Sequence, residues 1–349
     1  PTPDDITRKA VATVLGRPLQ LDDQVLTRIR ERGRRSGRKL PASVESQALL
    51  PRGATAWPNP LGTAPGLLML EADKPVILLP GVPQEMEALA TGFVVPYLRE
   101  RTGLAVESFT LRTAGVFESQ LHERIGTLPQ GWAGATLAYL PSYFGVDLRV
   151  TVTGADRAQV REVTARAYEA LKQRVAPVVY AEGARTIEEV VGEALVEKGW
   201  RLATAESCTG GLLARRITDV PGASRYFERG FVTYSNESKM QLVGVKAADL
   251  KAHGAVSAPV AEQLARGARE RARVEMGLGL TGIAGPEGGS EEKPVGTVFI
   301  GISSPRGDAV RRYRFAGTRK TIRERAAQTA LDLLRRELQG LPLDASLGE

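Results

Sequence analysis

Apolar and polar positions in the C-terminal half follow the pattern of an α/β domain. An apolar run at 200–205, a turn containing two glycines and an amphipathic run at 212–218 predict a strand, a tight turn and a helix. The remaining runs predict strands at 231–235, 276–280, 295–303 and 309–315, and helices at 187–197, 237–243, 259–275 and 321–338. This alternation predicts a three-layer α/β/α sandwich with a substantially parallel sheet in residues 183–349.

Two shorter regions precede this domain. Residues 1–102 predict helices at 6–15 and from 84, with strands at 67–70 and 74–79, as in an α/β unit. No strand pattern precedes the first helix, so we expect the first part of this domain to be absent from the chain. Residues 103–182 predict a compact α+β module. Its strands are expected at 104–112, 135–140 and 147–153, and its helices at 116–125 and 157–175.

Composition narrows the classes of function. The chain has 349 residues, 42% apolar and 25% charged, and no apolar run approaches the ~20 residues of a membrane helix. One cysteine excludes an intrachain disulfide framework and is typical of a reducing cytoplasm. The net charge is +7, but the basic clusters at 28–39 and 311–325 contain few aromatic residues, which disfavours nucleic-acid binding by base stacking. We therefore expect a cytoplasmic protein with no membrane partner.

The turn after the 200–205 strand carries the first candidate chemistry. It places the Ser207 hydroxyl at a strand end that faces a helix N-terminus, where free backbone N–H groups favour negative charge. Gly210 and Gly211 allow another molecule to approach the backbone closely. Together with the Thr209 region they are candidates for oxyanion donors. A strand, turn and helix with two glycines is nevertheless common in proteins that bind nothing there.

A serine needs a base that takes its proton. Lys239 lies five residues after Tyr234 across a strand-to-helix turn, so both side chains can face one cleft. Burial would lower the pKa of Lys239 and make it a usable base, with Tyr234 as proton relay or support. Each residue has a plainer interpretation, as an edge residue and a surface charge. His253 is the only histidine placed for a triad, and Cys208 is an alternative nucleophile.

Two further segments are candidates for holding an anionic substrate. Thr281 ends the 276–280 strand, and a glycine-rich loop runs from Gly282 to Gly289. Arg319 precedes the last helix and can place its guanidinium on an anion near the helix N-terminus. An ordinary turn explains each segment about as well.

Four motifs in chain order resemble the C-terminal domain of the CinA family. They are Thr204-Ala-Glu-Ser-Cys-Thr-Gly-Gly211, Phe227-Glu-Arg-Gly-Phe-Val-Thr-Tyr-Ser-Asn-Glu-Ser-Lys239, His253-Gly-Ala-Val-Ser257 and Thr281-Gly-Ile-Ala-Gly-Pro286 with Gly289-Ser-Glu-Glu-Lys-Pro-Val-Gly-Thr297. The N-terminal part is similar to that family's molybdopterin-binding-like domain through Pro1-Thr-Pro-Asp-Asp5, Gly62-Thr-Ala-Pro-Gly66 and Pro80-Gly-Val-Pro83. The middle module resembles the family's KH-like domain.

The resemblance implies a nicotinamide-mononucleotide amidohydrolase of NAD salvage, which needs no cofactor and forms a homodimer. Ser207 would be the nucleophile, Lys239 the base and Tyr234 its partner. Thr281 and Arg319 would hold the nucleotide substrate.

The resemblance also links the N-terminal domain to ADP-ribose hydrolysis with a divalent metal, for which Asp5 is the matching acidic residue. In the family a glycine-rich segment, a first strand and a first helix precede this position, and we expect them to be absent from the chain. Besides the amidohydrolase, two alternatives stay open. One is a pyrophosphatase centred on Asp5, and the other is a nucleotide- or nucleic-acid-binding module without turnover.

Overall fold

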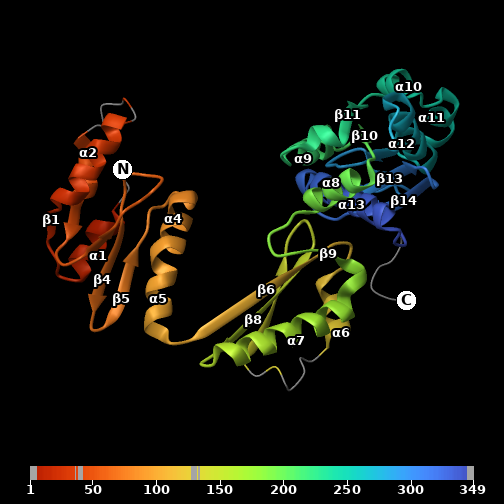
Figure 1. Ribbon diagram of the computed structural model, residues 1–349. Helices are drawn as coiled ribbons and strands as arrows, with labels where there is room; N and C mark the ends of the chain where they lie inside the picture. Colours follow the sequence, from red (N-terminus) through yellow and green to blue (C-terminus); the bar gives the residue numbers. More distant parts are fainter. Residues whose placement is uncertain (1–5, 36, 38–41, 127–131, 133, 344–349) are drawn as a thin grey trace. The chain divides into compact units, whose positions relative to one another are not determined.

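A computed structural model describes residues 6–35, 37, 42–126, 132 and 134–343 of the chain. The chain forms two compact units, residues 1–104 and 105–349 (Figure 1). The second unit contains both the middle module and the C-terminal domain, so each unit is described by itself.

The first unit is built on two small antiparallel sheets, β1-β2 and β3-β4-β5. Its elements are α1 (Thr7–Val14), β1 (Leu19–Leu21), α2 (Asp23–Arg35), α3 (Ala42–Glu45), the 3₁₀ turn η1 (Ser46–Ala48), β2 (Leu49–Pro51), β3 (Thr55–Trp57), β4 (Gly66–Glu71), β5 (Lys74–Leu78), α4 (Pro83–Leu89), the π-helical turn η2 (Ala90–Val94) and α5 (Val95–Thr102). Helix α2 was not predicted, because arginines interrupt its apolar pattern. Val25 and Ile29 lie one turn apart on it and pack in a core with Leu50.

The middle module is a four-stranded antiparallel sheet in the order β7-β8-β6-β9. Its elements are β6 (Ala105–Thr113), α6 (Glu118–Ile125), β7 (Ala135–Pro141), β8 (Val146–Gly154), α7 (Arg157–Val175), the 3₁₀ turn η3 (Ala176–Val178) and β9 (Val179–Glu182). Alternate residues of β8, such as Leu148 and Val150, are buried in one core with apolar residues of α6 and α7. The expected α+β order is confirmed, and β9 is an additional edge strand.

The C-terminal domain is built on a five-stranded sheet in the order β11-β10-β12-β13-β14. Its elements are α8 (Ile187–Lys198), β10 (Leu202–Glu206), α9 (Leu212–Thr218), the 3₁₀ turn η4 (Ala223–Arg225), β11 (Phe227–Val232), α10 (Asn236–Val243), α11 (Ala247–His253), α12 (Ala258–Ala272), β12 (Met276–Gly282), β13 (Thr297–Ser304), β14 (Gly307–Arg314) and α13 (Arg319–Gln339). The α/β class predicted for this domain is confirmed.

The sheet is parallel on one side and antiparallel on the other. β10 pairs in parallel with both β11 and β12, whereas the β12–β13 and β13–β14 pairs are antiparallel. The prediction of a substantially parallel sheet therefore holds for three strands. A hairpin connects β13 to β14, and a connection that short forces neighbouring strands to run in opposite directions.

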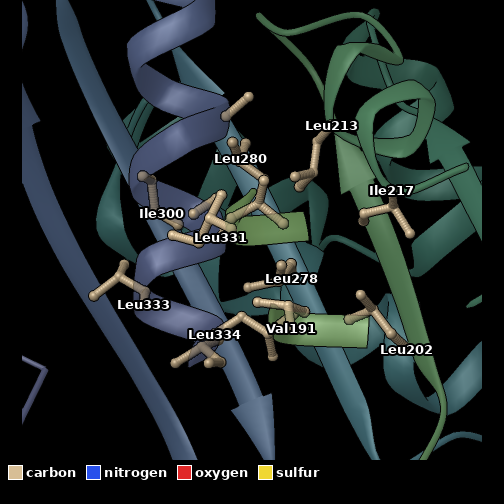
Figure 2. Close-up of a cluster of buried hydrophobic side chains, with 14 of the residues drawn as sticks. Val191, Leu202, Leu213, Ile217, Leu278, Leu280, Ile300, Leu331, Leu333 and Leu334 are labelled. Carbon is tan, nitrogen blue, oxygen red and sulfur yellow. The ribbon is translucent and has the colours of Figure 1, made fainter. Parts of the chain in front are cut away.

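Helices cover both faces of this sheet. On one face, apolar residues of α8, α9 and α13 interdigitate with those of β10, β12 and β13 (Figure 2). On the other face α12 packs against the strands at Gly279 and Gly301. A Cβ atom at either glycine would collide with the α12 backbone at Ala261. Glycine at these strand positions therefore lets the helix lie directly on the sheet.

Candidate active site

Three strands bring candidate residues to the same end of the sheet, where the carboxyl ends of these strands lie. β11, β10 and β12 are neighbours and parallel, so their carboxyl ends lie at the same edge. Ser207 follows β10, Tyr234 lies two residues beyond the end of β11, and Thr281 is the second-last residue of β12. Strand β11 begins and ends earlier than predicted, so Tyr234 belongs to the loop that follows it.

Ser207 and Lys239 are in direct contact. Lys239 Nζ lies 3.1 Å from Ser207 Oγ. The same nitrogen donates to the carbonyl oxygens of Thr233 at 2.8 Å and Tyr234 at 3.3 Å. Only 1% of Lys239 and 9% of Ser207 is exposed to solvent. The hydroxyl and the amine therefore meet in the protein interior.

The start of α10 explains how Lys239 reaches this position. Ser235 is the N-cap, because its hydroxyl accepts from the N–H of Ser238 at 3.0 Å. Lys239 lies in the first turn of the helix. Helical side chains tilt toward the N-terminus, which directs this one back to the loop carbonyls that precede α10.

Burial lowers the pKa of Lys239. Taking an ammonium group out of water disfavours the charged form, and none of the described ion pairs gives Lys239 a carboxylate that would offset this effect. The neutral amine is the form that can accept a proton. The geometry and the direction of the pKa shift thus both suit a base for Ser207.

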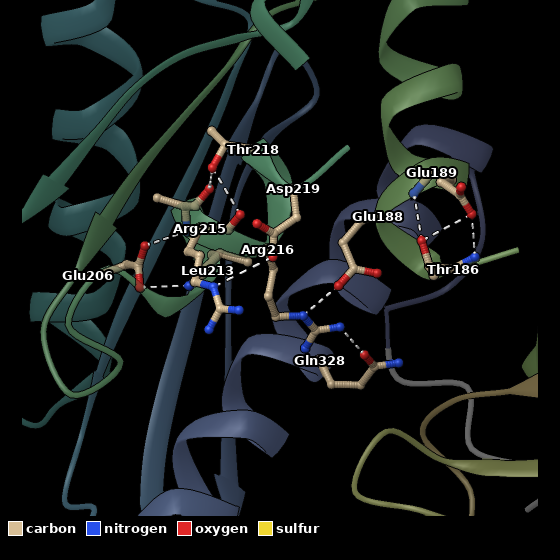
Figure 3. Close-up of polar contacts among 11 residues, drawn as sticks. Thr186, Glu188, Glu189, Glu206, Leu213, Arg215, Arg216, Thr218, Asp219 and Gln328 are labelled. Carbon is tan, nitrogen blue, oxygen red and sulfur yellow. Dashed lines mark hydrogen bonds and ion pairs between the residues drawn. The ribbon is translucent and has the colours of Figure 1, made fainter. Parts of the chain in front are cut away.

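The start of α9 is already occupied by a carboxylate. Glu206 accepts hydrogen bonds from the N–H groups of Gly211 at 3.0 Å and Ala214 at 2.8 Å. It also accepts from the N–H of Leu213 at 3.0 Å (Figure 3). These N–H groups were expected to be free for an anion, and that expectation is wrong. In the part of the chain that is described, no backbone hydrogen bond uses the N–H of Cys208 or Thr209, and both are directed at the Cys208 thiol, which is a weak acceptor. These two amides are the remaining candidates for oxyanion donors.

Cys208 points into the domain core rather than to the loop surface. It is 6% exposed and belongs to the hydrophobic cluster formed with α8, α9 and α13. Burial, with a smaller contribution from the charge of Glu206, raises the pKa of its thiol to about 11. A thiol that keeps its proton at neutral pH is a poor nucleophile. This environment favours Ser207 over Cys208.

The backbone and the side chain of Tyr234 make different contacts. Its carbonyl oxygen accepts from Lys239, whereas its phenol accepts a hydrogen bond of 2.8 Å from Arg319, and the residue is 61% exposed. Arg319 also donates to the carbonyl oxygen of Gly285 at 2.8 Å. The contact of Tyr234 with the lysine is therefore made by its backbone, while its side chain supports the arginine.

Some of the polar groups in the loop after Ser207 already have hydrogen-bond partners within the protein. Gly210 and Gly211 have φ values of 59° and 90°, in the left-handed region that glycine adopts without strain. The carbonyl oxygen of Thr209 accepts from Arg323 at 2.5 Å. The hydroxyl of Thr209 is fully buried and has no partner among the described residues. A buried hydroxyl without a partner is unusual, and the binding role of Thr209 stays a prediction.

Thr281 and Gly282, the next two predicted binding residues, differ in whether they can still contact a ligand. Thr281 is 1% exposed and donates to the carbonyl oxygen of Ala255 at 2.7 Å, which leaves its lone pairs as acceptors. A Cβ atom at Gly282 would lie 2.7 Å from a methyl group of Val298. Packing against β13 therefore explains Gly282 without a ligand.

The metal prediction concerns a residue outside the described chain. Asp5 lies among residues 1–5, and its role stays a prediction. Within the described residues no three His, Cys, Asp or Glu side chains gather in a group that could hold a metal ion. Among the same residues no helix has the length and apolar character needed to cross a membrane.

Sequence reasoning missed two residues that contact the Ser207 loop, Glu206 and Arg323. A glutamate as the last residue of a fully buried strand was a signal for Glu206, because such a carboxylate must find backbone donors. Arg323 reaches the loop from α13, far along the chain, and no local pattern indicates that contact.

Three family models together match most of the chain. Residues 184–338 match the CinA C-terminal domain, residues 108–181 the damage-inducible protein CinA KH domain, and residues 1–100 the probable molybdopterin binding domain.

Curated relatives align over nearly the same length. A CinA-like protein of Geobacter sulfurreducens is 44% identical over 340 residues, which are 97% of this chain and 82% of that protein. A putative competence-damage inducible protein of Symbiobacterium thermophilum is 42% identical over 353 residues, 97% of this chain and 83% of that one. Among solved structures, a CinA superfamily protein of Klebsiella pneumoniae is 32% identical, with a TM-score of 0.43 over 45% of this chain and 99% of that one.

Proposed function

The chain belongs to the CinA family, and on that premise we propose that residues 183–349 form a nicotinamide-mononucleotide amidohydrolase. The reaction converts nicotinamide mononucleotide and water into nicotinate mononucleotide and ammonia. The observation that carries the proposal is the buried contact of 3.1 Å between Lys239 Nζ and Ser207 Oγ. We expect the enzyme to act in NAD salvage in the cytoplasm, as a homodimer and without a cofactor in this domain.

The surroundings of Lys239 orient its lone pair. A neutral amine has two hydrogens, and the carbonyl oxygens of Thr233 and Tyr234 accept both. The lone pair then faces Ser207, whose hydroxyl becomes the donor of the third contact. In this arrangement Lys239 is ready to take the serine proton.

The first half of the reaction forms an ester. Ser207 Oγ attacks the carboxamide carbon while Lys239 takes its proton, and the carbonyl oxygen gains negative charge. The N–H groups of Cys208 and Thr209 are the donors left for that oxyanion. Lys239 then gives its proton to the amide nitrogen, the C–N bond breaks, and ammonia leaves a nicotinoyl ester on Ser207.

The second half reverses the roles. Water attacks the ester carbon as Lys239 takes a proton from it. Ser207 Oγ leaves, recovers that proton from Lys239, and nicotinate mononucleotide is released. Atoms and protons balance over the cycle, and the amine ends as it began.

Arg319 is the residue proposed to hold the phosphate of the nucleotide. Two of its five N–H donors are used by Tyr234 and Gly285, so donors remain for an anion. Thr281 and the unpartnered hydroxyl of Thr209 are the proposed contacts nearer the reacting group.

Ammonia release from nicotinamide mononucleotide tests the proposal. Ser207→Ala is expected to lower kcat by about 10⁴-fold or more, since removing a nucleophile leaves only the residual effects of binding and oxyanion donors. Cys208→Ala is the matched control at the next residue, and we expect it to keep kcat within about tenfold, because its thiol is buried and protonated.

Two results contradict the proposal. If Cys208→Ala releases no ammonia and Ser207→Ala remains active, the nucleophile is the thiol. If the parent chain binds the nucleotide but releases no ammonia, this domain is a nucleotide-binding module without turnover.

A further inference from the structure

Glu206 is a buried carboxylate at the centre of the candidate active site. It is the last residue of β10, directly before Ser207, and 1% of it is exposed. Its carboxylate accepts from the N–H groups of Gly211, Leu213 and Ala214 at 2.8–3.0 Å, and Figure 3 shows the contact with Leu213. None of the described ion pairs includes it, so these backbone donors and the start of α9 balance its charge.

These contacts close the Ser207 loop on itself. The loop leaves the backbone of Glu206 at one end, and the carboxylate of the same residue holds Gly211 and α9 at the other. A loop tied at both ends to one residue has few conformations. The position of the Ser207 hydroxyl is fixed accordingly.

The backbone of Glu206 reaches the second half of the site. Its carbonyl oxygen accepts from the N–H of Thr233 at 2.7 Å and from the Thr233 hydroxyl at 3.3 Å. The carbonyl oxygen of Thr233 in turn accepts from Lys239 Nζ at 2.8 Å. Glu206 therefore joins the segment that carries the hydroxyl to the segment that carries the amine.

We propose that Glu206 is a positioning residue, which holds Ser207 Oγ within reach of Lys239 through the backbone of both segments. This inference rests on the amidohydrolase proposed above. Glu206 does not touch the reacting atoms. Its carboxylate accepts hydrogen bonds from three backbone N–H groups and makes no described hydrogen bond to Ser207 or Lys239. Its loss disturbs the distance between nucleophile and base rather than substrate binding.

The domain supplies a matched control in α8. Glu189 accepts from the N–H of Thr186 at 2.7 Å in a capping box, so it is also a glutamate bound to backbone amides at a helix start (Figure 3). None of its described bonds involves Ser207, Thr233 or Lys239. Glu189→Gln thus reports the cost of weakening an acidic cap without disturbing the site.

Glu206→Gln keeps the size of the side chain but replaces one acceptor oxygen by an N–H₂ group that faces a backbone N–H. We expect kcat for ammonia release to fall by about 10- to 100-fold, since small displacements of reacting groups have effects of this size, while KM changes less than about threefold. Glu189→Gln is expected to lower Tm by a few degrees and to leave kcat within about twofold.

A second readout separates this inference from the proposed substrate. A fluorophosphonate reagent phosphonylates an activated serine with loss of fluoride and does not need to be recognised as a nucleotide. The rate of Ser207 modification, measured by mass spectrometry, is expected to fall in Glu206→Gln as kcat does. If the parent chain is modified at Ser207 but releases no ammonia, the proposed function fails. The role of Glu206 is then tested only by comparing the rates of Ser207 modification in the parent chain and in Glu206→Gln. If the parent chain does neither, both ideas are overturned.

The inference is overturned if Glu206→Gln keeps the kcat and modification rate of the parent chain. It is also overturned if these fall only as far as the folded fraction, measured by circular dichroism. Should Glu206→Gln not fold, Glu206→Asp replaces it, because the shorter side chain keeps the charge but withdraws it from the amides. Parental kcat in folded Glu206→Asp would equally overturn the inference.

Discussion

Two cations lie at the same edge of the C-terminal sheet, and their environments are opposite. Lys239 is 1% exposed and contacts Ser207, whereas Arg319 is exposed and contacts the phenol of Tyr234. Both lie in the first turn of a helix, and both donate to a loop carbonyl. Position in the fold is thus similar, and burial is the main difference.

Burial has different consequences for the two side chains. It lowers the pKa of Lys239, so that an amine able to lose its proton lies beside the serine. A guanidinium stays charged in either environment and presents donors in a planar fork. The buried cation is therefore suited to proton transfer, and the exposed one is suited to holding an anion.

The largest effect on this comparison is expected from Lys239→Met. Methionine fills a similar space without an amine, so we expect kcat to fall by about 10³-fold, in the range attributed to a general base. Thermal unfolding is expected at the same or a higher temperature, because the variant no longer buries an ionisable group. Ammonia release and calorimetry measure the two effects.

Lys251→Met is the matched control, because it removes an exposed lysine from the neighbouring α11. It should leave kcat unchanged. A Lys239→Met variant that keeps more than a tenth of the parental kcat would show that another group takes the serine proton.

The next effect is the dependence of kcat on pH. The active form of Lys239 is the neutral amine, so the rate is expected to rise with pH and to level off above the pKa of this residue. Because burial lowers that pKa, the midpoint should lie below 10.5, the ordinary value for lysine. Below the midpoint the rate should fall about tenfold per pH unit, as for a single titrating group.

Rate profiles of the parent chain and of Cys208→Ala test this assignment. The charge of Cys208 raises the pKa of Lys239, against the larger effect of burial, so the midpoint in Cys208→Ala should equal the parental one or lie below it. A midpoint at or above 10.5, or one that rises in Cys208→Ala, contradicts Lys239 as the base.

Much of this site could be predicted from local sequence patterns. The strand before Ser207 and the helix after it both follow from short-range rules and are present in the structure. Ser207, Tyr234 and Thr281 were each predicted near the end of a strand, and the carboxyl ends of parallel strands lie at the same end of a sheet. These features depend on residues that lie close together in the chain.

Other features depend on contacts between distant segments. Hydrophobic patterns give strands but not their pairing, so the antiparallel half of the sheet was not foreseen. The direction in which the Tyr234 phenol points is decided by Arg319, 85 residues further along the chain. Whether Lys239 is buried depends on the packing of α10 against the sheet, which no local pattern contains.

The smallest effect is expected from Tyr234→Phe, and it separates the two cations most sharply. The variant loses the hydroxyl that accepts from Arg319 but keeps the backbone carbonyl that accepts from Lys239. Because the lost hydrogen bond is exposed, we expect KM for nicotinamide mononucleotide to rise about threefold to tenfold, which corresponds to roughly 1 kcal/mol, with kcat nearly unchanged. Arg319→Lys, which loses the planar fork itself, should raise KM further in the same direction. Steady-state kinetics distinguish this result from a proton relay through the phenol, since a relay would lower kcat by about 100-fold and leave KM alone.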